Sequence, residues 1–99
     1  MAIVQRDIGD GVRCTGTFTD IADAVADPTA IVYRMSDPSG TVTVYTFGVD
    51  AELVKASTGV FYVDWTFLLA GDHYWRMEGT GAVTAAAEDF ERVRTSQIV

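Results

Sequence analysis

The chain has 99 residues, about the length of one compact domain, and carries 14 Asp and Glu side chains against 7 Lys and Arg, for a net charge of −7. That charge repels nucleic-acid phosphates and anionic lipids, so we expect neither nucleic acid nor a membrane as a partner. Val, Ile and Thr together number 30 and Leu only 3, a composition typical of β-strands.

Export and covalent cross-linking are both unexpected. Residues 1–12 (MAIVQRDIGDGV) lack the basic stretch and apolar run of a signal peptide, and no apolar run reaches the roughly 18 residues of a membrane span. The single cysteine, Cys14, excludes an internal disulfide. We therefore expect a soluble, unexported domain that is stabilised by its hydrophobic core.

Alternation of apolar and polar residues predicts the first strands. Residues 12–19 place Val12, Cys14 and Phe18 on one face and threonines and an arginine on the other, as in a half-buried strand. Residues 20–29 (DIADAVADPT) predict a loop, with or without one turn of helix, because Asp is frequent there and a proline ends it. Residues 30–36 alternate again and predict a second strand.

A hairpin is predicted next. In residues 37–40 (DPSG), the proline presets φ for a turn, Asp37 caps it and the glycine accepts the exit conformation. The returning strand, residues 41–47, places Val42 and Val44 on one face and Tyr45 on the other. Residues 51–57 fit either a helical turn or a small edge strand.

Two aromatic strands and an ambiguous segment follow. Residues 60–67 (VFYVDWTF) set four large apolar side chains on one face and predict a central strand, and residues 72–79 (DHYWRMEG) predict its neighbour in the core. Residues 82–93 fit a helical period, but we favour a strand near residues 89–95 with an irregularity between Phe90 and Val93, which would close a sheet.

These strands predict an all-β sandwich. The spacing of the turns, about 8–12 residues, is typical of that architecture. The side chains expected to form the core are Val12, Phe18, Tyr33, Val44, Phe61, Val63, Trp65 and Trp75.

No reactive site is predicted. Asp20, Asp23 and Asp27 lie in a loop where aspartates commonly form turns, and they lack the spacing of a calcium-binding loop. One histidine, His73, and one cysteine are too few for structural zinc, and no sequence motif presents a nucleophile to His73. The acidic residues Glu88, Asp89 and Glu91 are expected to form a solvated face rather than a pair for acid–base chemistry. We expect no enzyme activity, no metal and no cofactor.

Binding to other proteins is the remaining class. Four tyrosines on predicted strands either share an exposed face, which would stack on sugars or a partner, or cover the core. Arg92 and Arg94 near the end of the chain are candidates for contact with an acidic partner.

Three motifs together resemble one family. They are TGVFYVDW in residues 58–65, AGDHYWRMEGTG in residues 70–81 and DPSGTVTVYTFG in residues 37–48. Over residues 9–94 the chain resembles small immunoglobulin-like proteins encoded in the structural-gene regions of tailed bacteriophages and prophages. Cys14 stands where a larger aliphatic residue is usual in that group.

The resemblance implies a single immunoglobulin-like, antiparallel β-sandwich of about seven strands in residues 9–99. It implies a non-enzymatic virion protein made in the bacterial cytoplasm, such as a capsid decoration or a neck or tail accessory protein, which binds capsid, connector or tail proteins in a symmetric assembly. Residues 1–8 are then an edge strand or an arm that reaches a neighbouring subunit, with Ile3 as a contact. The alternative function is a carbohydrate-binding or adhesion module.

Overall fold

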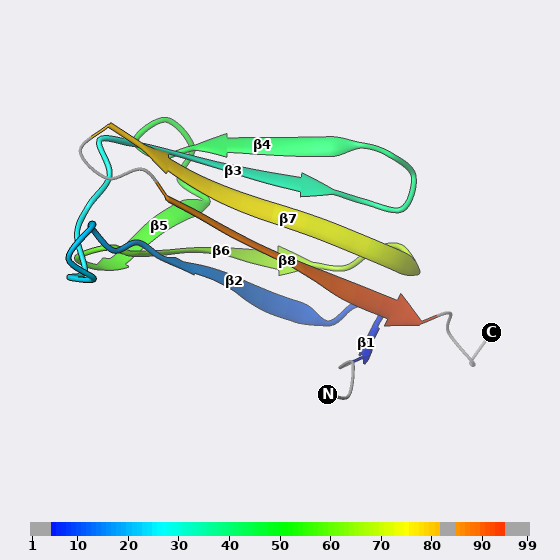
Figure 1. Cartoon of the computed structure of the whole chain (residues 1–99). Helices are drawn as coiled ribbons and strands as arrows, with labels where there is room; N and C mark the ends of the chain where they lie inside the picture. The colour runs from blue at the N-terminus through cyan, green and yellow to red at the C-terminus, as the bar shows by residue number, and fades with distance from the viewer. Residues whose placement is uncertain (1–4, 82–84, 95–99) are drawn as a thin grey trace.

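The computed structural model describes residues 5–81 and 85–94 and shows an all-β fold of two sheets, compatible with a β-sandwich (Figure 1). The larger sheet has the order β1-β8-β7-β3-β4. Its strands are β1 (Gln5–Asp7), β3 (Ala30–Ser36), β4 (Val42–Thr46), β7 (Gly71–Thr80) and β8 (Ala85–Arg94). The smaller sheet has the order β2-β6-β5, formed by β2 (Gly11–Thr17), β5 (Leu53–Ser57) and β6 (Val60–Thr66).

The strand count and one pairing differ from expectation. The described residues form eight strands rather than about seven, and they contain no helix. Every strand pair is antiparallel except β1 with β8, which run parallel with Gln5 opposite Arg92. Gln5–Asp7 thus form an edge strand, whereas Ile3 lies outside the described residues.

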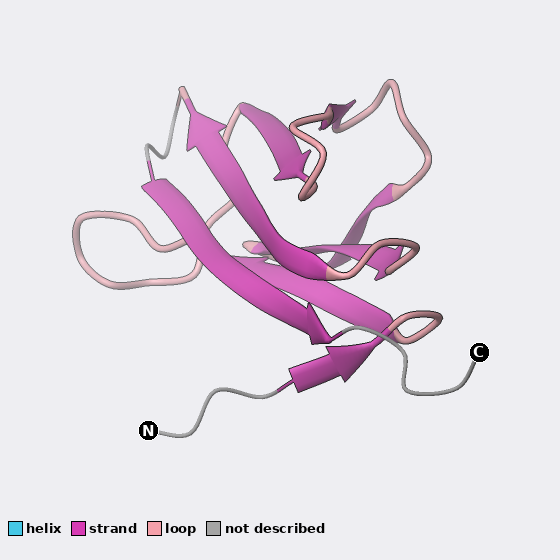
Figure 2. Ribbon diagram, turned by 90° about the vertical axis from the view of Figure 1, so that its right-hand side faces the viewer, coloured by secondary structure: helices cyan, strands magenta, loops and turns pink. Residues whose placement is uncertain are grey.

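The core lies between the two sheets, which Figure 2 shows as separate layers. Alternation along each strand sends one set of side chains into it. Of the predicted core residues, five are buried: Phe18, Tyr33, Phe61, Val63 and Trp75. Val12 and Trp65 are partly buried and pack against this cluster.

The prediction for Val44 is wrong, because its side chain is 48% exposed on the outside of the larger sheet. The pairing of β3 with β4 places Tyr45 opposite the buried Tyr33, with ring centroids 6.0 Å apart, so the Tyr45 face of β4 points inward. Both faces of this strand carry apolar side chains, so alternation alone does not decide which face is buried.

The hairpin predicted between β3 and β4 is confirmed. The carboxylate of Asp37 accepts hydrogen bonds from the backbone N–H groups of Ser39 and Thr41, both at 3.0 Å, and Gly40 has φ +89°. This is the turn chemistry for which aspartate and glycine are suited at these positions.

The connection from β2 to β3 is the predicted loop, and it is fastened at its end. Asp27 accepts hydrogen bonds from Lys55 Nζ at 2.6 Å and from the Gly59 N–H at 2.7 Å. Pro28 is buried against Gly79 of β7, so closely that a Cβ on Gly79 would lie 2.5 Å from Cγ of the proline. The loop therefore packs on both sheets.

The last strand is longer and more regular than predicted. β8 pairs with β7 in unbroken register from Gly79 opposite Ala85 to Gly71 opposite Val93, so both the helical alternative and the irregularity between Phe90 and Val93 are wrong. Cross-strand pairing outweighs the helical preference of its alanines. The segment left open between helix and strand, residues 51–57, contains the edge strand β5.

Candidate binding surface

The outward side chains of β1, β8, β7, β3 and β4 form a broad surface, here called the outer face. On β7, the inward residues His73, Trp75 and Met77 are buried, so Tyr74 and its alternate neighbours point away from the core. On β4 the outward residues include Val42 and Val44.

An exposed aromatic pair lies in the middle of the outer face. Tyr74 and Phe90 are direct cross-strand partners, with ring centroids 5.9 Å apart and an angle of 32° between the planes. Tyr74 is 52% exposed and Phe90 is 37% exposed. Aromatic side chains of this kind are enriched in protein–protein interfaces, where covering them removes a large apolar area from water.

Apolar side chains continue this pair to the edge of the sheet. The strand registers align Val42, Ser36, Tyr74 and Phe90 in one row across four strands. Val42 is 56% exposed, and Val44 lies in the next row. The outer face therefore carries a row of accessible apolar groups with only one small polar residue in it.

Ion pairs balance the charge beside this row. Four cations and four anions of the outer face pair with one another: Arg94 with Asp7, Arg92 with Asp72, Arg76 with Glu78 and Glu88, and Arg34 with Glu78. Their charges sum to zero, so the net charge of −7 comes from residues elsewhere in the chain.

The pairing also stabilises the charged forms. Hydrogen bonds from Arg94 to Asp7 and from Arg92 to Asp72 lower the pKa of each carboxyl, and Arg76 does the same to the pKa of Glu78. The side chains are exposed, so each pair contributes little to folding stability. Their main consequence is a locally neutral surface.

Arg92 and Arg94, the predicted partner contacts, thus lie on the outer face as members of ion pairs. The four tyrosines do not share one face: Tyr33 is buried, Tyr45 and Tyr62 are half-buried, and Tyr74 is exposed. The Tyr74 side chain could be identified from the sequence as outward, but its pairing with Phe90 depends on the register between β7 and β8.

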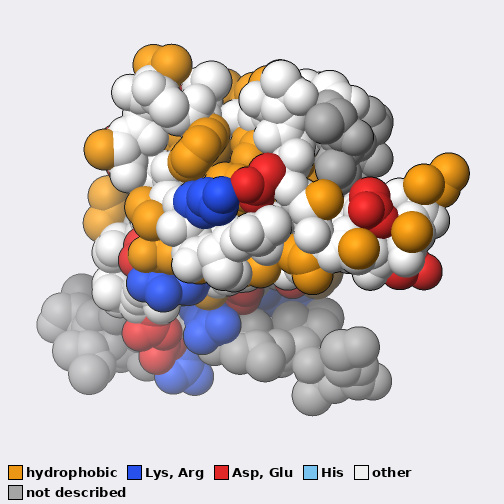
Figure 3. All heavy atoms as spheres, turned by 90° about the vertical axis from the view of Figure 1, so that its left-hand side faces the viewer, with side chains coloured by type: hydrophobic (Ala, Val, Ile, Leu, Met, Phe, Trp, Pro, Cys, Tyr) orange, Lys and Arg blue, Asp and Glu red, His pale blue; other side chains and the backbone are white. Residues whose placement is uncertain are grey.

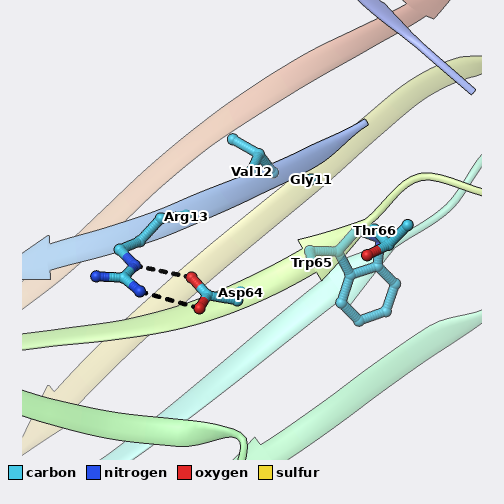
Figure 4. Close-up of a pocket in the computed structure, with 6 residues that line it drawn as sticks. All are labelled: Gly11, Val12, Arg13, Asp64, Trp65 and Thr66. Carbon is cyan, nitrogen blue, oxygen red and sulfur yellow. Dashed lines mark hydrogen bonds and ion pairs between the residues drawn. The ribbon is translucent and has the colours of Figure 1, made fainter. Parts of the chain in front are cut away.

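A shallow pocket of about 340 Å³ lies where β2 meets the end of β6 (Figure 4). Arg13 holds Asp64 through two hydrogen bonds, at 2.8 and 3.1 Å, and its guanidinium lies 3.8 Å from the centroid of the Tyr62 ring. Figure 4 shows the Trp65 ring pointing away from the Arg13–Asp64 pair. The Trp65 ring packs against the core, so it lies on the opposite face of β6 from Asp64.

The residues considered for chemistry are dispersed. Cys14 is buried on the same face as Phe18, in line with their shared face in the sequence pattern, and burial raises the pKa of its thiol to about 11. His73 is buried at the start of β7, its ring against Phe67, and its Nδ1 has no hydrogen-bond partner among the described residues. Within residues 5–81 and 85–94, no three His, Cys, Asp or Glu side chains are grouped to hold a metal ion.

Loops carry the other strongly exposed apolar residues. Ile21, Val49 and Leu68 are each at least 76% exposed. Figure 3, which views the end of the molecule that holds the β2–β3 connection, shows hydrophobic side chains interspersed with acidic and basic ones. Ile21, Val49 and Leu68 lie on three different connections between strands, whereas the row of the outer face is aligned by strand register.

Comparison of the chain with protein-family models, with curated proteins and with solved structures finds no match. No helix among the described residues is long and apolar enough to cross a membrane.

Proposed function

We propose that the protein is a non-enzymatic structural component of a tailed-phage particle and that it binds other virion proteins through the outer face. The exposed Tyr74–Phe90 pair on a charge-balanced sheet is the observation that carries the binding role. Association must desolvate the surface that it covers, and ion pairs already satisfied within one chain leave no isolated charge for the partner to neutralise.

The phage context is supported by the three sequence motifs that resemble phage structural proteins. They coincide with β6, β7 and the β3–β4 hairpin, which together supply much of the core and the centre of the outer face. The resemblance therefore concerns the segments that form both the fold and the candidate surface.

An immunoglobulin-like type of sandwich is part of the same proposal. In such domains one sheet contains strands C, F and G, with C′ added in the variable type, and the other contains B, E and D. If β2 is taken as strand B, the orders β8-β7-β3-β4 and β2-β6-β5 correspond to G-F-C-C′ and B-E-D. This correspondence supports the assignment.

The test is incorporation into particles. We expect the chain to copurify with phage particles at a fixed ratio to the major capsid or tail protein, as measured by quantitative mass spectrometry. The double variant Tyr74→Ser/Phe90→Ser removes the aromatic pair and should lower that ratio. Ile21→Ser, which also removes a fully exposed apolar side chain but lies off the outer face, is the matched control and should leave the ratio unchanged.

Absence of the chain from purified particles would contradict the proposal. Equal incorporation of the double variant would refute the role of the outer face alone. Glycan-array binding that survives the double variant and disappears in Arg13→Ala would instead favour the carbohydrate-binding alternative.

A further inference from the structure

The strand β4 is an edge that lacks the features by which edge strands avoid pairing. Each sheet has two edges, formed by β1 and β4 in the larger one and by β2 and β5 in the smaller. β1 has three residues, two of them charged; β5 has a register shift after Lys55; and β2 carries Arg13. β4 (VTVYT) has no charge, proline or bulge, and its residues favour strands.

The hydrogen-bond pattern shows which groups β4 presents outward. Thr41 and Phe47 bond toward the β3 side: Thr41 O accepts from the N–H of Asp37, which directly follows β3, and the Phe47 N–H donates to Ile31 O, both at 3.0 Å. Antiparallel pairing alternates, so residues 43 and 45 also bond to β3, and the N–H and C=O groups of residues 42, 44 and 46 point to the open side.

Only two of these three residues are available. The N–H of Thr46 donates to the Asp50 carboxylate at 2.9 Å, and its carbonyl accepts from the N–H groups of Val49 and Asp50. No described segment pairs with the outer side of β4, which forms the upper edge of the sheet in Figure 1. Val42 and Val44 therefore present two donors and two acceptors to solvent.

We propose that β4 pairs with β4 of a second copy of this chain, antiparallel, about a two-fold axis through Thr43. In this register Val42 of each copy lies opposite Val44 of the other, and each such pair exchanges two hydrogen bonds, four in all. The two larger sheets become one continuous ten-stranded sheet, and four valines meet on its outer face.

Self-complementarity favours a second copy as the occupant, because the free donors and acceptors of Val42 and Val44 match those of the same strand turned about a two-fold axis, and the charges near β4 do not oppose it. Two chains of net charge −7 repel each other wherever their unpaired carboxylates meet. β4 has no charged residue, and Arg34, the charged cross-strand neighbour of Val44 on β3, is already paired with Glu78. A symmetric β4–β4 contact therefore brings valine against valine, and the Asp50 carboxylate on the same side of β4 is already hydrogen-bonded to the Thr46 N–H of its own chain. It is independent of membership in a phage particle.

Sedimentation equilibrium of the isolated chain tests this pairing. We expect a concentration-dependent dimer. Val42→Pro removes a donor that β3 does not use, and proline is tolerated at such edge positions, so it should raise the dimer dissociation constant about tenfold or more. Val42→Thr keeps the donor and the strand preference and is the matched control. A monomer at all concentrations, or a Val42→Pro dimer as tight as the control, overturns the proposal.

Val44→Lys replaces Val42→Pro in this test if Val42→Pro does not fold, as judged by circular dichroism. It keeps every hydrogen bond to β3 but places a charge at the contact, so it should weaken the dimer.

The register has its own test. Thr43 would face Thr43 of the second copy in a pair without hydrogen bonds, where Cα atoms approach to about 4.5 Å, so Thr43→Cys should form an interchain disulfide in oxidising buffer.

Val44→Cys is the control. In the proposed register position 44 of one copy lies diagonally across the axis from position 44 of the other, so this variant should cross-link much more slowly. Equal cross-linking of the two variants would refute the register. The dimer is measured on the isolated chain, and incorporation is measured on particles with variants at Tyr74 and Phe90, which lie on β7 and β8 rather than on β4. Failure of the pairing is therefore distinguishable from failure of the proposed function.

Discussion

The hydroxyl of Tyr33 donates a hydrogen bond to Sγ of Cys14 at 3.5 Å, joining the larger sheet to the smaller in the middle of the core. Both side chains are buried, and burial raises the pKa of the tyrosine as well as that of the thiol. The contact gives each polar atom a partner that the apolar surroundings do not provide.

The burial of Cys14 predicts alkaline sensitivity, because it raises the pKa of the thiol although the hydrogen bond from Tyr33 lowers it. The Cys14 thiol has a pKa of about 11 in the folded chain against 9.0 ordinarily, so its contribution to stability is complete below pH 9 and is lost as the pH rises toward 11. At about 1.4 kcal/mol per pH unit, the loss is at most about 3 kcal/mol. Urea unfolding of the wild type and Cys14→Ala from pH 8 to pH 11 measures it: the two curves should converge, and parallel curves would contradict the prediction.

The loop that holds Asp27 should be released by acid. The hydrogen bond from Lys55, then that from the Gly59 N–H, lowers the pKa of Asp27 below 3.8. This stabilisation is present above pH 4 and lost as the pH falls through the lower pKa. The hydrogen-exchange protection factors of residues 20–27, which are corrected for the intrinsic pH dependence of exchange, should fall as the pH drops below 4, and Asp27→Asn should show the low protection already at pH 5. Asp23→Asn, in the same loop but without a side-chain partner among the described residues, is the control.

Gly79 should not tolerate even a methyl group. A Cβ there would lie 2.5 Å from Cγ of Pro28 and 3.1 Å from the ring of Phe18, so Gly79→Ala should lower the free energy of unfolding by about 1–3 kcal/mol. Gly11→Ala is the matched control in another strand, because its Cβ would meet only the Trp65 carbonyl at 3.8 Å. Chemical denaturation measures the unfolding midpoints of the two variants. Equal midpoints for Gly79→Ala and Gly11→Ala would refute the close packing at Gly79.

Two valines distinguish the faces of the sheets. Val63→Thr places a hydroxyl in a fully buried position and should cost about 1–3 kcal/mol of folding stability, whereas Val44→Thr, at an exposed position, should change it by less than about 0.5 kcal/mol. Thermal and urea unfolding measure both. A comparable loss at Val44 would contradict its outward placement.

Alternation predicted the strands whose two faces differ in character. β2, β3, β6 and β7 each set large apolar residues against polar ones, and the inward side follows from that contrast alone. β4 and β8 were harder, because β4 is apolar on both faces and the alanines of β8 fit a helix as well as a strand. Pairing with β3 determines which face of β4 points inward, and pairing with β7 determines that β8 is a strand.

The candidate surface could be predicted only in fragments. Tyr74, Arg92 and Arg94 were recognisable as outward or charged residues, but the row through Val42 and Phe90 needs the registers of three strand pairs. The neutrality of the outer face likewise depends on ion pairs between strands. Local sequence patterns do not show which strands are neighbours in the sheet, so these pairs could not be predicted.

The parallel pairing of β1 with β8 brings the two ends of the described fold together at one edge of the larger sheet. Gln5 lies opposite Arg92 and Asp7 opposite Arg94, so the chain enters and leaves the described fold at the same corner. The uncovered edge at β4 lies four strand spacings away, about 19 Å across the sheet. A tether fused at either end would hold the protein by that corner and leave β4 pointing away from the point of attachment.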